Sequence, residues 1–340
     1  MTLLFMDGFA AGDWSTKWEY MSLWTVDTTL PRLPGGFTAT CNYSGILHRI
    51  FTASPEIIVG VAVRFTAGAH FGVMWLGDSA ALPYIYIHRT EEGYIRVTSS
   101  GSTFNATGTT VVDDDTWIYV EVRAIIHPTN GVCQVRLNGS NSNEIDYAGN
   151  TTRTGVGAID IASFGLDSTN GGERFTDVYV LNTAGAVNNT WLGDMHVYTI
   201  VPTSDGSSSQ WLGSDGDSVN NWALIDELPV TGADYPVPEA DYVGSSTIGA
   251  VDLYGLGALP DGITDIKGIA WNGFVSKSDA GARAAAAVLL SDSTTDTGPS
   301  LTLPTSPATQ QVIWEADPAT SAAWTPEAVD DLEAGIQVDS

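Results

Sequence analysis

The chain has 340 residues, of which 43% are hydrophobic and 16% charged, a composition typical of a globular protein with room for two cores. Its 40 acidic residues outnumber 13 Lys and Arg, and the formal net charge of −27 argues against a nucleic acid partner. Two cysteines, Cys41 and Cys133, make no disulfide framework, and both lie within apolar alternation, so we expect buried free thiols.

The N-terminal residues do not resemble a secretory signal, because a basic segment is missing and Asp7 interrupts the apolar run. The longest candidate for a membrane segment, 284–290, is far shorter than the ~20 apolar residues that a membrane helix needs. We therefore expect neither signal-directed secretion nor a membrane partner.

From residue 36 to residue 201 the sequence predicts short strands separated by turn signals, at intervals of about ten residues. They are expected at 36–43, 45–51, 56–65, 70–77, 83–88, 94–99, 158–164, 174–181 and 194–201. Aromatic residues are frequent in 7–24, and this segment is expected to lie on the outer edge of the domain or to cap one of its faces. Because no convincing amphipathic helix accompanies the strands, the succession is typical of a β-sandwich.

The clearest element is a long antiparallel hairpin over 116–140. Apolar and polar residues alternate along 118–123 and again along 132–137, which is the period of a half-buried strand. Between them Asn130 and Gly131 can take the positive φ angles that a reversal needs. A hairpin cannot bury its apolar face alone, so we expect further strands around it and a second sheet facing it.

This hairpin carries a resemblance to a known family. Residues 113–119 and 135–139 resemble the D-x-x-W-x-x-V … V-x-L-x-x-N-G hairpin of concanavalin A-like, laminin G-like jelly rolls. Residues 174–180 are similar to a late strand of the same domains. The resemblance covers roughly residues 5–200 and implies a concanavalin A-like (laminin G-like) jelly-roll domain over 1–202, a statement about fold rather than function.

Gly, Ser and Asp dominate 203–216, and periodicity stops there, so this segment is predicted to be a linker. A second, smaller β-sandwich domain is expected over 217–340. Its strands are expected at 245–253, 264–275, 284–291, 298–303 and 311–315. The alanine run at 284–291 has helical propensity, but its flanking Gly and Asp/Ser/Thr residues favour a strand.

The tail predicts one short helix. Thr325 can cap it, Pro326 suits its first position, acidic residues follow, and Gly335 is expected to end it. A last short strand is expected at 336–338.

Three segments, 187–206, 274–283 and 317–338, resemble segments of tailed-bacteriophage virion proteins in which a laminin G-like jelly roll is joined to a second small β domain. This resemblance covers nearly the whole chain. It implies a structural virion protein that assembles with other virion proteins, with the second domain over 217–340 serving virion attachment or oligomerisation.

The most tempting catalytic match is Glu144-Ile145-Asp146. Jelly-roll β-glucanases carry E-x-D-x-x-E or E-x-D-x-x-x-E on a strand, where two glutamates on one face act as nucleophile and acid. Here Gly149 and Asn150 stand at the positions of the second glutamate. One carboxylate cannot perform the paired role, so we expect a solvated Asp/Glu pair on a loop.

Metal ligation has weak support. His48, His70, His88, His127 and His196 show no short ligand spacing. Two acidic stretches, 113–115 and Asp205 with Asp215 and Asp217, could hold calcium through oxygen ligands. Neither has the spacing of a known calcium loop, so hydrated turns are favoured and no cofactor is predicted.

The eleven tryptophans allow either core packing or surface binding. Trp75, Trp117, Trp271 and Trp314 lie in apolar strands and are expected in the core. Trp14, Trp18, Trp191, Trp211, Trp222 and Trp324 lie near loops or termini, where they suit subunit contacts or stacking on sugars.

The first hypothesis is therefore a non-enzymatic, oligomeric structural component of a tailed-phage virion, either a capsid decoration or a tail or fibre component. The alternative is a carbohydrate-binding adhesin that recognises host surface glycans. A jelly-roll glycoside hydrolase is a weaker alternative, because of Gly149 and Asn150.

Overall fold

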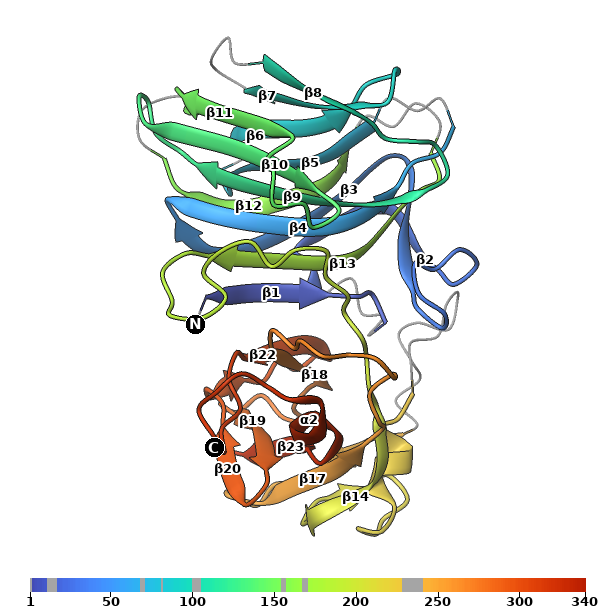
Figure 1. Ribbon diagram of the computed structural model, residues 1–340. Coiled ribbons are helices and arrows are strands. Elements are labelled where there is room, and N and C mark those ends of the chain that lie inside the picture. Colours follow the sequence, from blue (N-terminus) through green and yellow to red (C-terminus); the bar gives the residue numbers. More distant parts are fainter. Residues whose placement is uncertain are drawn as a thin grey trace. The chain divides into compact units, whose positions relative to one another are not determined.

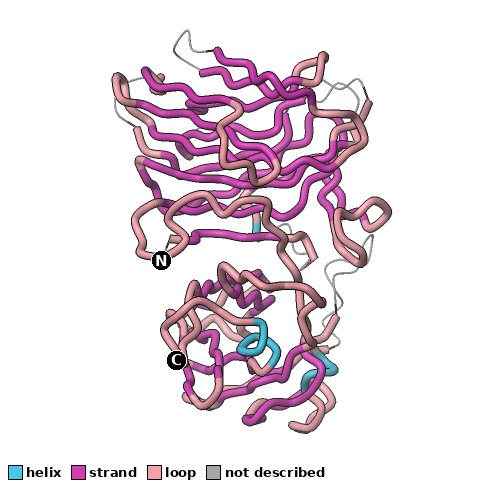
Figure 2. The backbone as a smooth tube through the Cα atoms, viewed as in Figure 1, coloured by secondary structure: helices cyan, strands magenta, loops and turns pink. Residues whose placement is uncertain are grey.

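The computed structural model describes residues 2–10, 17–67, 71–80, 82–99, 105–153, 157–166, 171–227 and 241–340. Strands make up most of it, and helix is confined to short pieces (Figure 2). The chain folds as two compact units, the first comprising Met1–Ala10 and Trp18–Val197, the second Ala11–Lys17 and Tyr198–Ser340. Within the described ranges no helix has the length and apolar character needed to cross a bilayer.

The first unit is one 13-stranded antiparallel sheet (Figure 1). Its strands are β1 (Leu3–Asp7), β2 (Tyr20–Asp27), β3 (Thr38–Ser54), β4 (Glu56–Arg64), β5 (Phe71–Asp78), β6 (Leu82–Arg89), β7 (Tyr94–Ser99), β8 (Asn105–Val111), β9 (Trp117–Ile125), β10 (Gly131–Leu137), β11 (Ile145–Gly149), β12 (Ile159–Leu166) and β13 (Glu173–Asn182). The order is β11-β10-β9-β4-β13-β3-β12-β5-β6-β7-β8, with β1 on β13 and β2 on β3.

This strand order confirms the all-β prediction and has the form of the expected concanavalin A-like jelly roll. Strands β5 to β8 form a meander, whereas β4 lies between β9 and β13, and β12 lies between β3 and β5. Crossed antiparallel connections of this kind are typical of jelly rolls. The strands predicted at 56–65, 70–77, 83–88, 94–99, 158–164 and 174–181 are confirmed as β4, β5, β6, β7, β12 and β13.

The central hairpin is confirmed as β9 and β10, with Val122 opposite Val135. Its turn differs from the prediction, because neither Asn130 nor Gly131 is among the described residues with a positive φ. A Cβ on Gly131 would lie 2.1 Å from Oγ1 of Thr151. The glycine is therefore required by close packing rather than by backbone conformation.

Two of the predicted strands are merged into one, and a third is absent. The strands expected at 36–43 and 45–51 are one continuous strand, β3, which Gly45 does not interrupt. The strand expected at 194–201 is absent, because amides of this segment are bonded to side chains instead of a neighbouring strand. Gly193 N–H donates to Glu121, and Val197 N–H donates to Asp177. Strands β1, β2, β8 and β11 were not predicted.

Aromatic residues build the core of the first unit. The Trp18 ring contacts Phe5 at 4.9 Å and Phe164 at 5.8 Å between centroids, and its Nε1–H donates to Asp7. Trp18 is thus fully buried, contrary to its expected place near a loop or subunit contact. Cys41 and Cys133 are buried free thiols, as predicted, and burial raises the pKa of each to about 12.

The second unit contains β14 (Pro202–Ser209), β15 (Leu212–Gly213), η1 (Asn221–Leu224), β16 (Val243–Gly244), β17 (Val251–Leu256), β18 (Ile269–Val275), β19 (Ala284–Ser291), β20 (Thr294–Thr297), β21 (Leu301–Thr302), β22 (Ala308–Trp314), α2 (Pro326–Asp330) and β23 (Glu333–Val338). A six-stranded sheet has the order β14-β17-β23-β19-β20, with β21 on β19, and two-stranded ladders join β15 to β16 and β18 to β22.

Apolar side chains from β19 and from the β18–β22 ladder form the core between these two layers. Leu289 packs in one cluster with Trp314, Trp324 and Val329. This is a small β-sandwich with one short helix, as predicted. Trp211 and Trp324, expected near loops or termini, are buried.

The predicted linker at 203–216 is instead part of this sandwich, since it forms most of β14 and all of β15. Its polar residues are held by hydrogen bonds rather than by apolar packing. Ser207 bonds to Glu333, and Asp205 accepts the backbone amides of Asn220 and Trp222. Because β14 also pairs with β17, a Gly/Ser/Asp-rich composition does not by itself distinguish a linker from a strand.

The helix cap is confirmed, because Oγ1 of Thr325 accepts the amide of Ala328 at 3.2 Å. The predicted stop is wrong, since α2 ends at Asp330 and Gly335 lies inside β23. A Cβ on Gly335 would lie 1.8 Å from the carbonyl oxygen of Asp252 on β17. Strand β19 matches the range predicted at 284–291.

Candidate functional site

Glu144 precedes β11 and closes an edge of the sheet rather than facing a ligand. Its carboxylate accepts the backbone amides of Thr109 and Thr110 and the hydroxyl of Thr110, the last two at 2.7 Å. Burial raises the pKa of Glu144, but these hydrogen bonds lower it by more than burial raises it. The pKa of Glu144 is therefore below its usual value. The expected solvated carboxylate is thus an ionised group bonded to β8.

The rest of the glucanase-like motif is also engaged in local bonds. Asp146 accepts the side-chain amide of Gln134 at 2.9 Å. Gly149 pairs with Gly131 across β11 and β10, and Asn150 accepts the amide of Thr152. The motif therefore supplies no second glutamate, and the carboxylate of Asp146 is bonded to Gln134.

The two stretches considered for calcium are bonded within the protein. Asp114 pairs with Arg89 at 2.6 Å and Asp115 with Arg64 at 2.9 Å. In the second stretch Asp217 accepts the amide of Val219. Across the described ranges, no three His, Cys, Asp or Glu side chains gather as a metal site.

The histidines are dispersed. Nδ1 of His127 accepts amides of its own turn, His196 contacts Asp177 at 3.2 Å, and His88 lies on β6. His48 packs between Tyr20 and Trp75. His70 and Trp14 lie outside the described residues.

A group of hydrogen-bonded polar side chains lies across β9 and β13, the two neighbours of β4, and we call Arg32, Tyr119, Glu121, Asp177 and Tyr179 the anchor cluster. Glu121 on β9 and Tyr179 on β13 both pair with Gly60 on β4, so they lie in one row. The Tyr179 hydroxyl donates to Oε1 of Glu121 at 2.5 Å. The same Oε1 accepts the amide of Gly193 at 2.9 Å.

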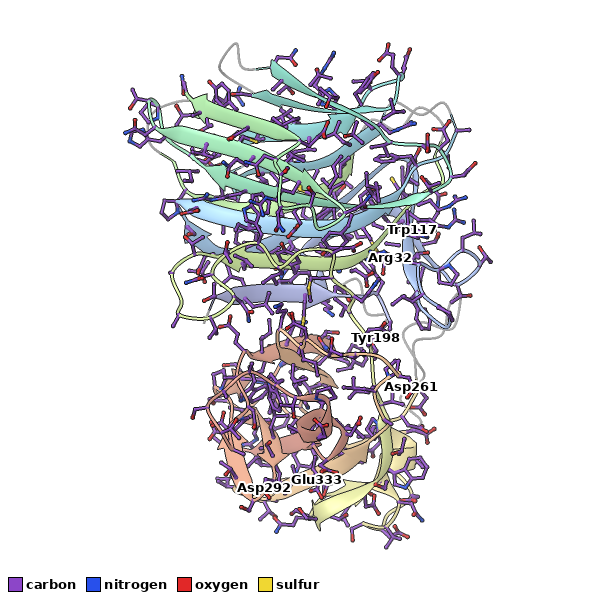
Figure 3. All side chains as sticks on the ribbon, in the orientation of Figure 1. Arg32, Trp117, Tyr198, Asp261, Asp292 and Glu333 are labelled. Atoms are coloured by element: carbon purple, nitrogen blue, oxygen red, sulfur yellow. The ribbon has the colours of Figure 1, made fainter. Side chains whose placement is uncertain are left out.

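Arg32 joins the loop between β2 and β3 to this cluster (labelled in Figure 3). Its Nη1 donates to Asp177 at 2.7 Å and to the carbonyl of Met195 at 2.8 Å, and it also pairs with Asp194. Burial lowers the pKa of Arg32, but the two carboxylates raise it above its usual value. The guanidinium also lies over the ring of Tyr119, 5.1 Å from its centroid.

The anchor cluster is closed to a substrate. Tyr119 and Glu121 have no exposed surface, and burial raises the pKa of both Tyr119 and Tyr179 well above the usual value. Its bonds to Gly193, Met195 and Val197 hold the segment that leaves the first unit against the sheet. We therefore assign it a structural role.

A second group, which we call the aromatic row, crosses the other part of the sheet. Successive register partners place Tyr20, His48, Ser163, Trp75 and Tyr86 on one face of β2, β3, β12, β5 and β6. His48 lies 5.3 Å from Tyr20 and 5.5 Å from Trp75 between ring centroids. Phe164, next to Ser163, points to the core, so the row lies on the face turned away from it.

The row combines an exposed aromatic ring with buried polar atoms. The side chain of Tyr20 is exposed, whereas Trp75 lies deeper in the row. Nδ1 of His48 and Oγ of Ser163 are buried and have no hydrogen-bond partner among the residues that the structure describes. Burial lowers the pKa of His48, which favours the neutral imidazole. Trp75 is buried, as expected from its apolar strand. Sequence reasoning missed the grouping of the other residues with it, because only the strand register brings them together.

No protein-family model and no curated protein sequence matches this chain. Among solved structures it is similar to a sialidase (14% identity, TM-score 0.35, covering 44% of this chain and 15% of that chain). It is also similar to an alginate lyase in complex with alginate tetrasaccharide (12%, 0.35, 52% and 92%) and to a SAP-like pentraxin from Limulus polyphemus (11%, 0.31, 41% and 70%). The chain thus spans a small part of the sialidase. Similarity at this level assigns no activity or ligand.

Proposed function

We propose that this chain is a non-enzymatic structural component of a tailed-phage virion, either a capsid decoration or a tail or fibre component. It would be made in the host cytoplasm and would act by protein–protein assembly, as an oligomer, with other virion proteins. The resemblance of 187–206, 274–283 and 317–338 to virion proteins supports this proposal.

The hydrogen bonds of the Glu144 carboxylate support the non-enzymatic part of the proposal. Retaining glycosidases need two carboxyl groups about 5–5.5 Å apart, one as nucleophile and one as acid. Both carboxylate oxygens of Glu144 accept hydrogen bonds from Thr109 and Thr110. Gly149 and Asn150, at the positions of the second glutamate, have no acidic side chain. A glycoside hydrolase built on this motif is therefore disfavoured.

Two measurements test the proposal. The first is gold-labelled antibody against this protein on intact particles of the phage that encodes it. Label over the head would support a capsid decoration, label on the tail would support a tail or fibre component, and unlabelled particles would overturn the virion role. The second is incubation of the purified protein with bacterial surface polysaccharides, where turnover would overturn the non-enzymatic role.

The aromatic row favours a second candidate function, binding of host surface glycans. The apolar C–H face of a pyranose stacks on aromatic rings, and its hydroxyls seek polar partners beside them. The row offers the exposed ring of Tyr20 beside the neutral imidazole of His48. Tyr86 and Thr98 continue it across β6 and β7.

A glycan array tests this second function. We expect wild-type protein to bind at least one bacterial glycan and Tyr20→Ala to lose roughly tenfold in affinity, which is about 1.4 kcal/mol. Tyr242→Ala is the matched control, since Tyr242 is 56% exposed and Tyr20 51%, and the two lie in different units. If the wild type binds no glycan on the array, or if Tyr20→Ala and Tyr242→Ala lose affinity equally, glycan binding by the aromatic row is contradicted.

A further inference from the structure

The negative charge is concentrated in the second half of the chain. Residues 1–197 contain 19 acidic residues and 10 Lys and Arg, a formal charge of −9. Residues 198–340 contain 21 acidic residues and 3 Lys and Arg, a formal charge of −18. From 197 to 266 there are 11 acidic residues and no Lys, Arg or His. Such an asymmetry steers oppositely charged partners to one part of a molecule.

Within this acidic stretch, the β15–β16 ladder presents large apolar side chains to solvent. Leu212 pairs with Gly244, and Tyr242 lies two residues before Gly244, so all three share one face. A Cβ on Gly244 would lie 3.9 Å from the ring of Tyr242, which places the ring beside the position opposite Leu212. Leu212 and Tyr242 are each 56% exposed.

The turn after β15 adds a third apolar residue and the nearest acids. Gly213 N–H donates to the carbonyl of Asp217 at 2.7 Å, so this turn folds back on β15. Asp217 accepts the amide of Val219, which is 60% exposed. Asp215 also lies against β15, since a Cβ on Gly213 would be 2.5 Å from its Oδ1. We call Leu212, Val219 and Tyr242 the apolar tip.

The strand that carries Leu212 is held rigidly. Its neighbour Trp211 is buried with Ala250, Ala285 and Ile336, and its Nε1–H donates to the carbonyl of Ala250 at 3.0 Å. The fully buried Asp252 accepts the amide of Trp211 at 2.9 Å. Leu212 therefore cannot turn inward to bury its side chain, and its exposure is a fixed feature of the fold. Exposed apolar patches rimmed by polar residues mark interaction sites.

We propose that the apolar tip is the surface through which the second unit docks on a partner protein with an apolar centre and a rim rich in Lys and Arg. The inference rests on the proposed assembly function and adds the surface and the chemistry of the partner. A second copy of this chain would bring Asp215, Asp217 and Asp241 against the same acids. Anionic lipids and nucleic acids are negatively charged, so the acidic residues around the apolar tip would repel them as well.

The test uses the full chain and two fluorescent amphipathic peptides of equal length, one of Leu and Lys and the other of Leu and Glu. The Lys peptide should bind, and more weakly as salt is added, whereas the Glu peptide should not. Leu212→Ser with Tyr242→Ser should weaken binding about tenfold or more. The matched control is Val111→Ser with Leu23→Ser, which removes two residues of the first unit that are 52% and 59% exposed.

Equal binding of the Lys peptide to both double variants would mean that charge alone attracts it, and would overturn the proposal. Absence of binding to the wild type would overturn it as well. Circular dichroism establishes that each variant is folded, and Tyr242→Ala alone provides a milder substitution if the double variant is not. This outcome is separate from the immunogold result, because particles can carry the protein whether or not the apolar tip is the contact.

Discussion

The Tyr179 hydroxyl donates a 2.5 Å hydrogen bond to Oε1 of Glu121, although strand β4 lies between their strands. Neighbouring strands are about 4.8 Å apart, so this bond bridges two strand spacings. It is possible because the intervening residue is Gly60, which leaves room for the ring of Tyr179. Gly60 is therefore a packing requirement of the anchor cluster.

Gly60→Ala is expected to destabilise the first unit by about 2 kcal/mol, in the range of overpacking substitutions. The new Cβ would lie 2.2 Å from Cε1 of Tyr179 and 2.8 Å from the hydroxyl of Tyr119, so the ring must leave Glu121. Urea unfolding measures the loss. Gly257→Ala is the control, because its nearest neighbour would be 3.6 Å away. Equal midpoints for the two variants would contradict this account.

Arg32→Ala is expected to cost roughly 3 kcal/mol, because it leaves the buried carboxylate of Asp177 without its guanidinium partner. Hydrogen exchange at Val197 should also accelerate, since its amide donates to Asp177. Arg283→Ala removes only a solvent-exposed pair with Asp279 and should leave the unfolding midpoint unchanged. Unchanged exchange at Val197 in Arg32→Ala would argue against the anchoring role.

Glu144→Ala is expected to open the β8 edge of the sheet. The amides of Thr109 and Thr110 lose their acceptor, so their hydrogen exchange should accelerate. An unprotected edge strand is a template for pairing with another chain, so light scattering should show more self-association. Asp146→Ala, which removes only a bond to the side chain of Gln134, should do neither. Protected amides in Glu144→Ala would show that another group closes the edge.

The stabilising effect of Glu144 should depend on pH. Its pKa in the folded state is lowered, so its contribution is present above the unfolded pKa of about 4.3 and is lost as the pH falls through the folded value. Wild type should be more stable than Glu144→Gln at neutral pH, and the two should converge on acidification. Urea unfolding across this range measures the difference. If the difference in unfolding free energy between wild type and Glu144→Gln stays constant with pH, the ionised carboxylate is not the cause of that difference.

Neither cysteine should react with a thiol reagent in the native protein near neutral pH. Cys41 and Cys133 are buried, and burial raises the pKa of each to about 12, so the reactive thiolate is scarce. Both should react once the chain is unfolded in guanidinium. Rapid labelling of one thiol under native conditions would indicate local opening of β3 or β10, which mass spectrometry of the labelled peptide would identify.

The predictions that succeeded depend on local patterns. The β9–β10 hairpin follows from period-2 alternation, and the N-terminus of α2 follows from Thr325 and Pro326. Two of the failures involve contacts distant in the sequence. Strand β14, in the apparent linker, pairs with β17 and donates its Ser207 amide to Glu333, whereas Glu121 and Asp177 keep 194–197 out of a strand. In both cases a carboxylate distant in the sequence accepts backbone amides, which no local pattern predicts.

The sequence by itself determined the all-β class, the two-part organisation and the free buried thiols, because burial pattern, turn chemistry and composition act over a few neighbouring residues. It also identified Glu144 as a residue of interest, without its role. Only the tertiary structure decided that Glu144 closes a sheet edge, that Gly60 admits Tyr179, and that Tyr20, His48 and Trp75 share a face. The physical reason is strand register: one antiparallel alignment sets which distant side chains become neighbours, and a shift of one residue would turn them to the opposite face.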